Sequence, residues 1–362
     1  MSALIFIAVI VVLIVVHELG HFIAAKLSGM RVDEFGLGYP PRALTITTIG
    51  ETSYTLNWLP FGGFVKIFGE DGGGADPRAF SKRPRILQAI VLAAGILMNL
   101  LFAYILITGA LMFGTPRALS QSEIATAKNV ELAVADVLPA SPASRAGIVP
   151  GDSILRAVDR KGQWQAADPK SFSAFVAASD GEVLTLEVKH NGVSTLVVAT
   201  PASGLITSDP TRFALGVSVA TIGIVPLSFW SALTQGATLT WGALTLTAQG
   251  LGHFFYGILT FSADLSQVAG PVGIAGVVGS ASTQGLGDLF SIMAIISINL
   301  ALINLIPIPA LDGGRLLFVL IESIIRRPIK PSIAQAVNTI GFVFLIVLMV
   351  VVTAHDVFKI IH

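Results

Sequence analysis

Four long runs of apolar residues dominate the pattern along this chain, and each is long enough to cross a lipid bilayer. A spanning helix needs about 20 predominantly apolar residues. We therefore predict a polytopic α-helical membrane protein whose four transmembrane helices cover residues 1–27, 86–113, 288–312 and 336–356.

Two stretches between these runs have the shorter periods of β-structure. Residues 28–85 are rich in glycine and include a segment of β character, Tyr54–Lys66, which we expect to dip into the membrane as a re-entrant element. In residues 128–203, short apolar runs alternate with turn signals, and Asn191-Gly192 marks a hairpin. The expected strands, which predict a separate β-rich domain, are Val134–Val137, Ser153–Val158, Val183–Val188 and Ser194–Val198.

The stretch 213–263 is harder to interpret, because it contains no Asp, Glu, Lys or Arg but many Thr, Ser, Gln and Gly residues. Basic loops tend to lie on the cytoplasmic side of a membrane. A single additional span here would put the loop containing Arg326 and Arg327 on the outer side. The stretch therefore holds either no spans or two. We expect amphipathic helices that lie at the outer membrane surface.

Composition and charge agree with a membrane protein and add a topology. Hydrophobic residues make up 53% of the chain, charged residues 12%, and the mean hydropathy is +0.79. Zero net charge argues against a nucleic-acid partner, and the lack of cysteine excludes disulfides and thiolate metal sites. Twelve of the 22 Lys and Arg residues lie in 26–85 and 313–335, so these two connections are predicted to be cytoplasmic. Both termini and the β-rich domain would then be extracytoplasmic.

The first apolar run contains a group of residues that is costly to place in a membrane, His17-Glu18-Leu19-Gly20-His21. On a helix, His17 and His21 are one turn apart on the same face and can bind one metal ion. Glu18 lies beside them, where it can take a proton from water at the metal. The alternative is a pair of histidines satisfied by hydrogen bonds within a helix bundle.

A catalytic zinc site usually has three protein ligands, so a third is needed from another span at a similar depth. Asp312 is the candidate, since it ends the third span after Pro307 and Pro309 interrupt the helix. Irregular backbone at membrane depth is tolerated only beside protein or a water-filled cavity, and hydrolysis needs such a cavity. The alternative for Asp312 is a turn residue that caps a helix at the interface.

The segment Ser141–Asp152 resembles the signature of bacterial PDZ domains, which bind extended chains or carboxyl termini by strand addition. The alternative is a β-rich spacer without a ligand. The chain as a whole resembles the site-2 proteases, intramembrane zinc metalloproteases, and among them the bacterial RseP-type branch with a single PDZ domain. The resemblance rests on the His17–His21 motif together with the segments Phe35–Tyr39, Leu59–Lys66, Ala93–Asn99, Ser141–Asp152, Gly270–Ile274 and Asn304–Gly314.

This resemblance implies a role for each site residue. His17, His21 and Asp312 would ligate Zn²⁺, Glu18 would be the general base, and Asn304 would bind the substrate backbone. Asn99 is either a further substrate-binding or metal-supporting residue or an interhelical hydrogen bond. The substrates would be single-span membrane proteins whose outer domains have been trimmed, such as anti-sigma factors or signal-peptide remnants. The implied location is the bacterial inner (plasma) membrane.

Two features depart from the family pattern. Ile96 stands where a proline commonly follows Ala-Gly, which puts a local bend near Asn99 in doubt, and only one PDZ-like module is present. Two other functions stay open. A catalytically inactive PDZ adaptor with a structural zinc would not need Glu18, and a coupled transporter would show repeated halves, which the sequence lacks.

Overall fold

The computed structural model describes residues 2–70, 76–190, 192–206, 209–260, 262, 270–327 and 329–361. The chain divides into two compact units. The first joins the described residues up to Phe113 with those from Ser228 onward, and the second is Gly114–Leu227.

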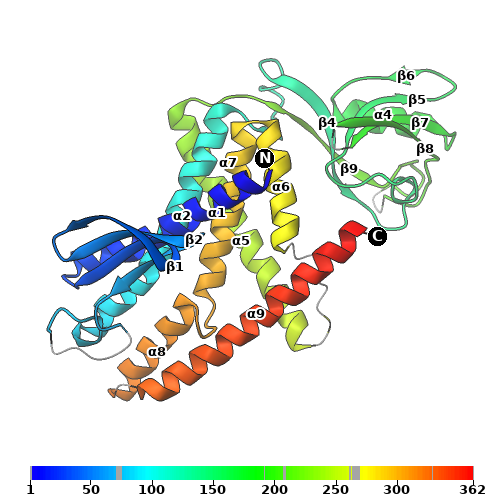
Figure 1. Ribbon diagram of the computed structural model, residues 1–362. Coiled ribbons are helices and arrows are strands. Elements are labelled where there is room, and N and C mark those ends of the chain that lie inside the picture. Colours follow the sequence, from blue (N-terminus) through cyan, green and yellow to red (C-terminus); the bar gives the residue numbers. More distant parts are fainter. Residues whose placement is uncertain are drawn as a thin grey trace. The chain divides into compact units, whose positions relative to one another are not determined.

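Four helices of the first unit are long and apolar enough to cross a membrane, as predicted from the sequence. They are α1 (Ser2–Leu27), α2 (Arg85–Phe113), α7 (Leu286–Leu305) and α9 (Pro331–Ile361). Figure 1 shows α1, α2 and α7 side by side. Their shared core contains Leu13 of α1, Ala103 of α2 and Ile298 of α7, all fully buried. This core places the His-Glu motif of α1 against the middle of α2.

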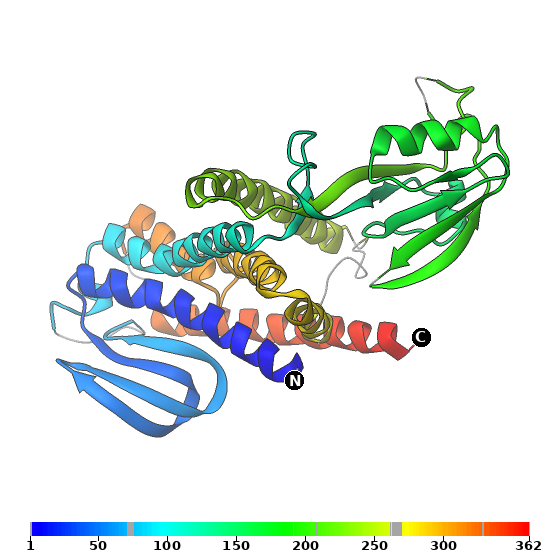
Figure 2. The same ribbon diagram turned by 90° about the horizontal axis from the view of Figure 1, so that it is seen from above.

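A β-hairpin follows α1 and lies beside it (Figure 2). Its strands are β1 (Val32–Ile49) and β2 (Thr52–Ile67), so the β character of Tyr54–Lys66 is confirmed. The hairpin folds back on itself: Gly36 pairs with both Thr55 and Phe64. The end of β2 therefore forms an edge, paired with β1 on one side and facing α1 on the other.

The helix before Asp312 is shorter than predicted. α7 ends at Leu305, and α8 (Asp312–Ile325) begins at Asp312, so this residue opens a helix instead of ending one. Pro307 and Pro309 explain the break, because proline lacks an N–H and disfavours helical backbone in the preceding residue. The predicted loop 313–335 is likewise corrected, since most of it is helix α8 and the start of α9.

The second unit is a β-domain with two short helices, α3 (Pro142–Arg145) and α4 (Pro169–Ala178). The sheet order is β3-β9-β4-β5-β7-β8, with β6 paired to β5. The four strands expected from the sequence are present, and β7 pairs with β8 from His190 opposite Val193; Asn191 lies outside the described residues. The strands are β3 (Pro116–Ala118), β4 (Lys128–Val137), β5 (Ser153–Val158), β6 (Gln163–Trp164), β7 (Leu184–His190), β8 (Val193–Ala199) and β9 (Val217–Ile224).

The prediction of amphipathic helices over 213–263 is wrong in its first part. Residues Val217–Ile224 form β9, which pairs with β3 and β4, so the β-domain extends beyond the predicted 128–203. The remainder is one helix, α5 (Phe229–Leu259), followed by α6 (Pro271–Gln284). α5 packs on α2, where the Tyr104 hydroxyl donates to the Leu233 carbonyl at 3.2 Å. Because this stretch contains no charged residue, the sequence did not show where the alternating pattern of strand β9 ends and the helical pattern of α5 begins.

Candidate metal centre

The two histidines of the sequence motif converge on one point inside the first unit. Both lie on the same face of α1, with exposed fractions of 6% for His17 and 8% for His21. Their Nε2 atoms are 3.2 Å apart. The helical spacing of four residues produces this arrangement, since it places the side chains one turn apart.

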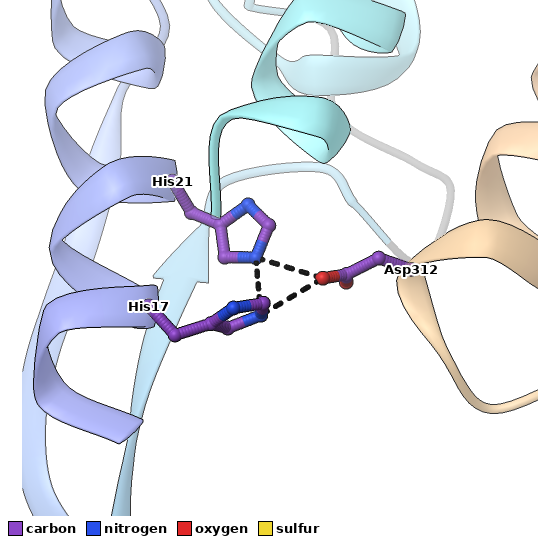
Figure 3. Close-up of side chains that lie close together, drawn as sticks. All are labelled: His17, His21 and Asp312. Atoms are coloured by element: carbon purple, nitrogen blue, oxygen red, sulfur yellow. Dashed lines mark hydrogen bonds and ion pairs between the residues drawn. The ribbon is translucent and has the colours of Figure 1, made fainter. Parts of the chain in front are cut away.

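Asp312 joins the pair from the start of α8, as Figure 3 shows. Its Oδ2 atom lies 2.9 Å from His17 Nε2 and 3.1 Å from His21 Nε2. The three ligand atoms thus form a nearly equilateral triangle from residues almost 300 positions apart in the chain. Among the described residues, they form the one group of three or more metal-ligating side chains found this close together.

Each imidazole is also held from behind. His21 Nδ1 donates to the carbonyl of Val91 at 2.8 Å, which fixes Nε2 as the unprotonated nitrogen of the neutral ring. His17 Nδ1 lies 3.1 Å from the side-chain amide of Asn99. Asn99 is fully buried, and its Oδ1 has no partner among the described residues. If the Asn99 amide is flipped by about 180°, Oδ1 accepts a hydrogen bond from His17 Nδ1–H. Both imidazoles then present the Nε2 lone pair to a metal.

This donor set fits a zinc ion. Zinc–nitrogen bonds of about 2.0–2.1 Å place tetrahedral ligand atoms about 3.3 Å apart, close to the edges of the observed triangle. Two neutral imidazoles and one carboxylate leave a fourth coordination position open, which is the pattern of catalytic zinc sites.

Glycines on both helices make the close approach of α1 and α2 possible. A Cβ atom at Gly95 of α2 would overlap with His21 Nε2 and lie 2.9 Å from His17 Cε1. On α1, a Cβ at Gly20 would overlap with the carbonyl oxygen of Ala94. The backbone of α2 therefore forms the wall against which the imidazoles lie.

Glu18 lies beside the triangle and contacts the edge of the hairpin. Its Oε2 accepts a hydrogen bond from the backbone N–H of Val65 in β2, at 3.1 Å. This edge packs against α1, since a Cβ at Gly63 would be in ordinary contact, at 3.8 Å, with both Glu18 Cγ and Val15 Cγ2. The Glu18 carboxylate is thus placed between the metal ligands and the edge of β2.

The two candidate asparagines lie in different surroundings. Asn304 is half-buried in the last turn of α7, just before the proline-containing segment, and no hydrogen-bond partner for it occurs among the described residues. Asn99 is buried beside His17 on α2, which continues through Ile96 as an unbroken helix. The backbone contacts of Val65 with Glu18 and of Val91 with His21 were not predicted, because no residue type signals a backbone contact.

Comparison with known proteins gives one consistent result. The family model described as "Peptidase family M50" matches residues 5–348. A "putative zinc metalloprotease" from Clostridium perfringens is 36% identical, and the match covers 95% of each chain. Proteins with the same description from Nostoc and Synechocystis are each 34% identical, over 96% and 98% of this chain and 93% and 94% of theirs.

Proposed function

The chain belongs to peptidase family M50, and on this premise we propose that it is an intramembrane zinc metalloprotease that hydrolyses peptide bonds within the transmembrane segments of single-span proteins. The observation that carries the proposal is the triangle of His17, His21 and Asp312 with Glu18 beside it. The histidines and Glu18 lie on α1, a helix apolar enough to span a bilayer, and Asp312 lies at the start of α8. The expected substrates have outer domains that another protease has already trimmed.

The chemistry divides between the metal and the side chains. Zinc, when held by His17, His21 and Asp312, polarises the scissile carbonyl and makes water more acidic. Glu18 acts as the general base that takes a proton from the attacking water. The same carboxyl group then gives a proton to the leaving amine. The N–H of Val65 keeps the Glu18 carboxylate oriented while it carries out both steps.

A transmembrane helix hides its peptide bonds, so the enzyme must offer replacement hydrogen bonds when the substrate unwinds. The edge of β2 that faces α1 supports this role, because an extended substrate segment can add to a strand edge. Asn304 adds a side chain without a partner among the described residues, and we assign it to the substrate backbone. Asn99 is better suited to orienting His17 than to touching substrate, because it is fully buried.

The β-domain is assigned an extracytoplasmic role. We take it to be a PDZ-type module that either excludes untrimmed outer domains or holds a trimmed carboxyl terminus. The distribution of basic residues supports a bacterial inner-membrane protein with both termini outside.

The decisive experiment separates metal binding from hydrolysis. Glu18→Gln removes the base but none of the three ligands, so the variant should retain zinc and lose cleavage of a reconstituted single-span substrate by at least 10²-fold. Zinc content and cleavage are measured on the same preparation. Cleavage at the wild-type rate would refute the protease assignment and favour the alternative, an inactive PDZ adaptor whose zinc is structural.

A further inference from the structure

We propose that Asn338 and Gly341 of helix α9 position the metal ligand Asp312 by holding the six-residue connection Ile306–Leu311. The inference rests on the proposed zinc site, but it concerns residues far from the His-Glu motif in sequence. It assigns a function to a helix that contributes no ligand of its own.

The connection has an unusual backbone next to the ligand. Ala310 has a φ angle of +76°, which is uncommon for a residue with a side chain. Its N–H donates to Oδ1 of Asn338 at 3.2 Å. Ala310 precedes Asp312 by only two residues, so any rearrangement of this peptide displaces the carboxylate.

α9 makes a second contact one turn further along the same face. Gly341 is buried, and a Cβ there would overlap with the carbonyl oxygen of Pro309 and lie 2.7 Å from Pro309 Cβ. Asn338 and Gly341 are three residues apart and therefore neighbours on the helix surface. Much of the rest of α9 is exposed and apolar, for example Val343 and Val347.

The opposite side of the connection is equally close-packed. A Cβ at Gly313 would overlap with the carbonyl oxygens of Leu305 and Ile306, and one at Gly314 with that of Ile308. The start of α8 and one face of α9 thus both contact the connection, of which Pro307 and Ala310 remain exposed. Catalytic metal ligands must be held to within about 0.5 Å of the productive geometry. The connection contains two prolines and one residue with a positive φ angle, so it has no regular backbone hydrogen bonding to hold the Asp312 carboxylate in place. The two contacts from Asn338 and Gly341 of α9 can hold it.

The test uses the purified full chain and two readouts other than activity: zinc affinity by chelator competition, and the visible absorption of the Co²⁺-substituted protein. Asn338→Ala removes the acceptor and should weaken zinc binding about 10–100-fold, with a changed Co²⁺ spectrum. Asn338→Asp keeps an acceptor and should stay near the wild type in both measurements. Thr339→Ala is the matched control, because the neighbouring hydroxyl donates to the Gln335 carbonyl of its own helix and, among the described residues, forms no hydrogen bond with the connection.

Wild-type zinc affinity and spectrum in Asn338→Ala would overturn the inference, and so would equal losses in the Ala and Asp variants. If Asn338→Ala does not fold, Gly341→Ala provides an independent test, since the added methyl must push Pro309 away and should weaken zinc binding. Unchanged zinc binding in that variant would also count against the proposal. A wild-type protein that binds no zinc would refute the proposed function itself, which distinguishes the two failures.

Discussion

At the scale of single residues, the site depends on the absence of a side chain as much as on its ligands. Gly95 is the nearest example, since its Cα faces the Nε2 atom that His21 offers to a metal. Its neighbours Ala94 and Ile96 are apolar, and α2 contacts the imidazoles with two polar groups, the carbonyl of Val91 and the amide of Asn99.

Replacing Gly95 with alanine should therefore damage the metal site without adding charge or polarity. The new methyl would occupy the space of the His21 ring, so we expect zinc affinity to fall at least 10-fold. Gly276→Ala on α6 is the control, because outside its chain neighbours and the backbone of its own helix no heavy atom of the described residues lies within 4 Å of a Cβ there. Chelator competition compares the two variants, and equal affinities would contradict the assigned packing.

The sequence revealed the site residues that carry a chemical signal. His17, Glu18 and His21 stand in a spacing that has one obvious chemical use, and the prolines before Asp312 marked the broken helix. Asn99 stayed open because an asparagine in an apolar helix has several uses, and its contact with His17 depends on how α1 and α2 pack. The supporting N–H of Val65 could not be predicted, since backbone groups are the same at every residue.

At the scale of elements, long patterns were more informative than short ones. The four apolar helices follow from the length of their apolar runs, and strands β4, β5, β7 and β8 from their short apolar runs between turn signals. Helix α8 was missed because Gly313, Gly314 and Arg315 at its start look like a loop. Strand β9 was missed because its polar positions, Ser218 and Thr221, also fit an amphipathic helix.

One prediction concerns the start of the β-domain, where the Glu123 carboxylate accepts hydrogen bonds from Arg117 of strand β3 and from Ser120 in the turn that follows. Hydrogen bonds from the Arg117 guanidinium, and then from Ser120, lower the pKa of Glu123 to about 2. A lowered pKa means that the ionised carboxylate stabilises the fold fully above the ordinary value of 4.5, and that this contribution is lost as the pH falls towards 2. For a partly exposed pair it amounts to about 1 kcal/mol or less.

Hydrogen exchange of β3, corrected for the intrinsic effect of pH, measures this loss. Protection should fall up to about fivefold between pH 5 and pH 2.5 in the wild type. In Glu123→Gln the protection should already be low at pH 5 and should change little. The same pH dependence in both proteins would show that the carboxylate does not stabilise this strand.

At the scale of the whole molecule, the membrane topology is predicted from the distribution of basic residues. The expected arrangement puts 28–85 on the cytoplasmic side and the β-domain outside. The absence of cysteine makes this directly testable, because the unmodified chain has no thiol to react.

Ser81→Cys and Gln165→Cys place single thiols at exposed positions of the two regions. A membrane-impermeant maleimide should label position 165 in spheroplasts and position 81 only after the membrane is disrupted. Labelling of position 81 from outside would reverse the topology and with it the assignment of the β-domain.

The distance along the chain between His21 and Asp312 has a consequence for biosynthesis. A ribosome has made more than four fifths of the polypeptide before the aspartate emerges. Until then only two of the three ligands of the proposed metal site are present. On the proposed function, the site can therefore form only after the β-domain and helices α5 to α7 have been synthesised.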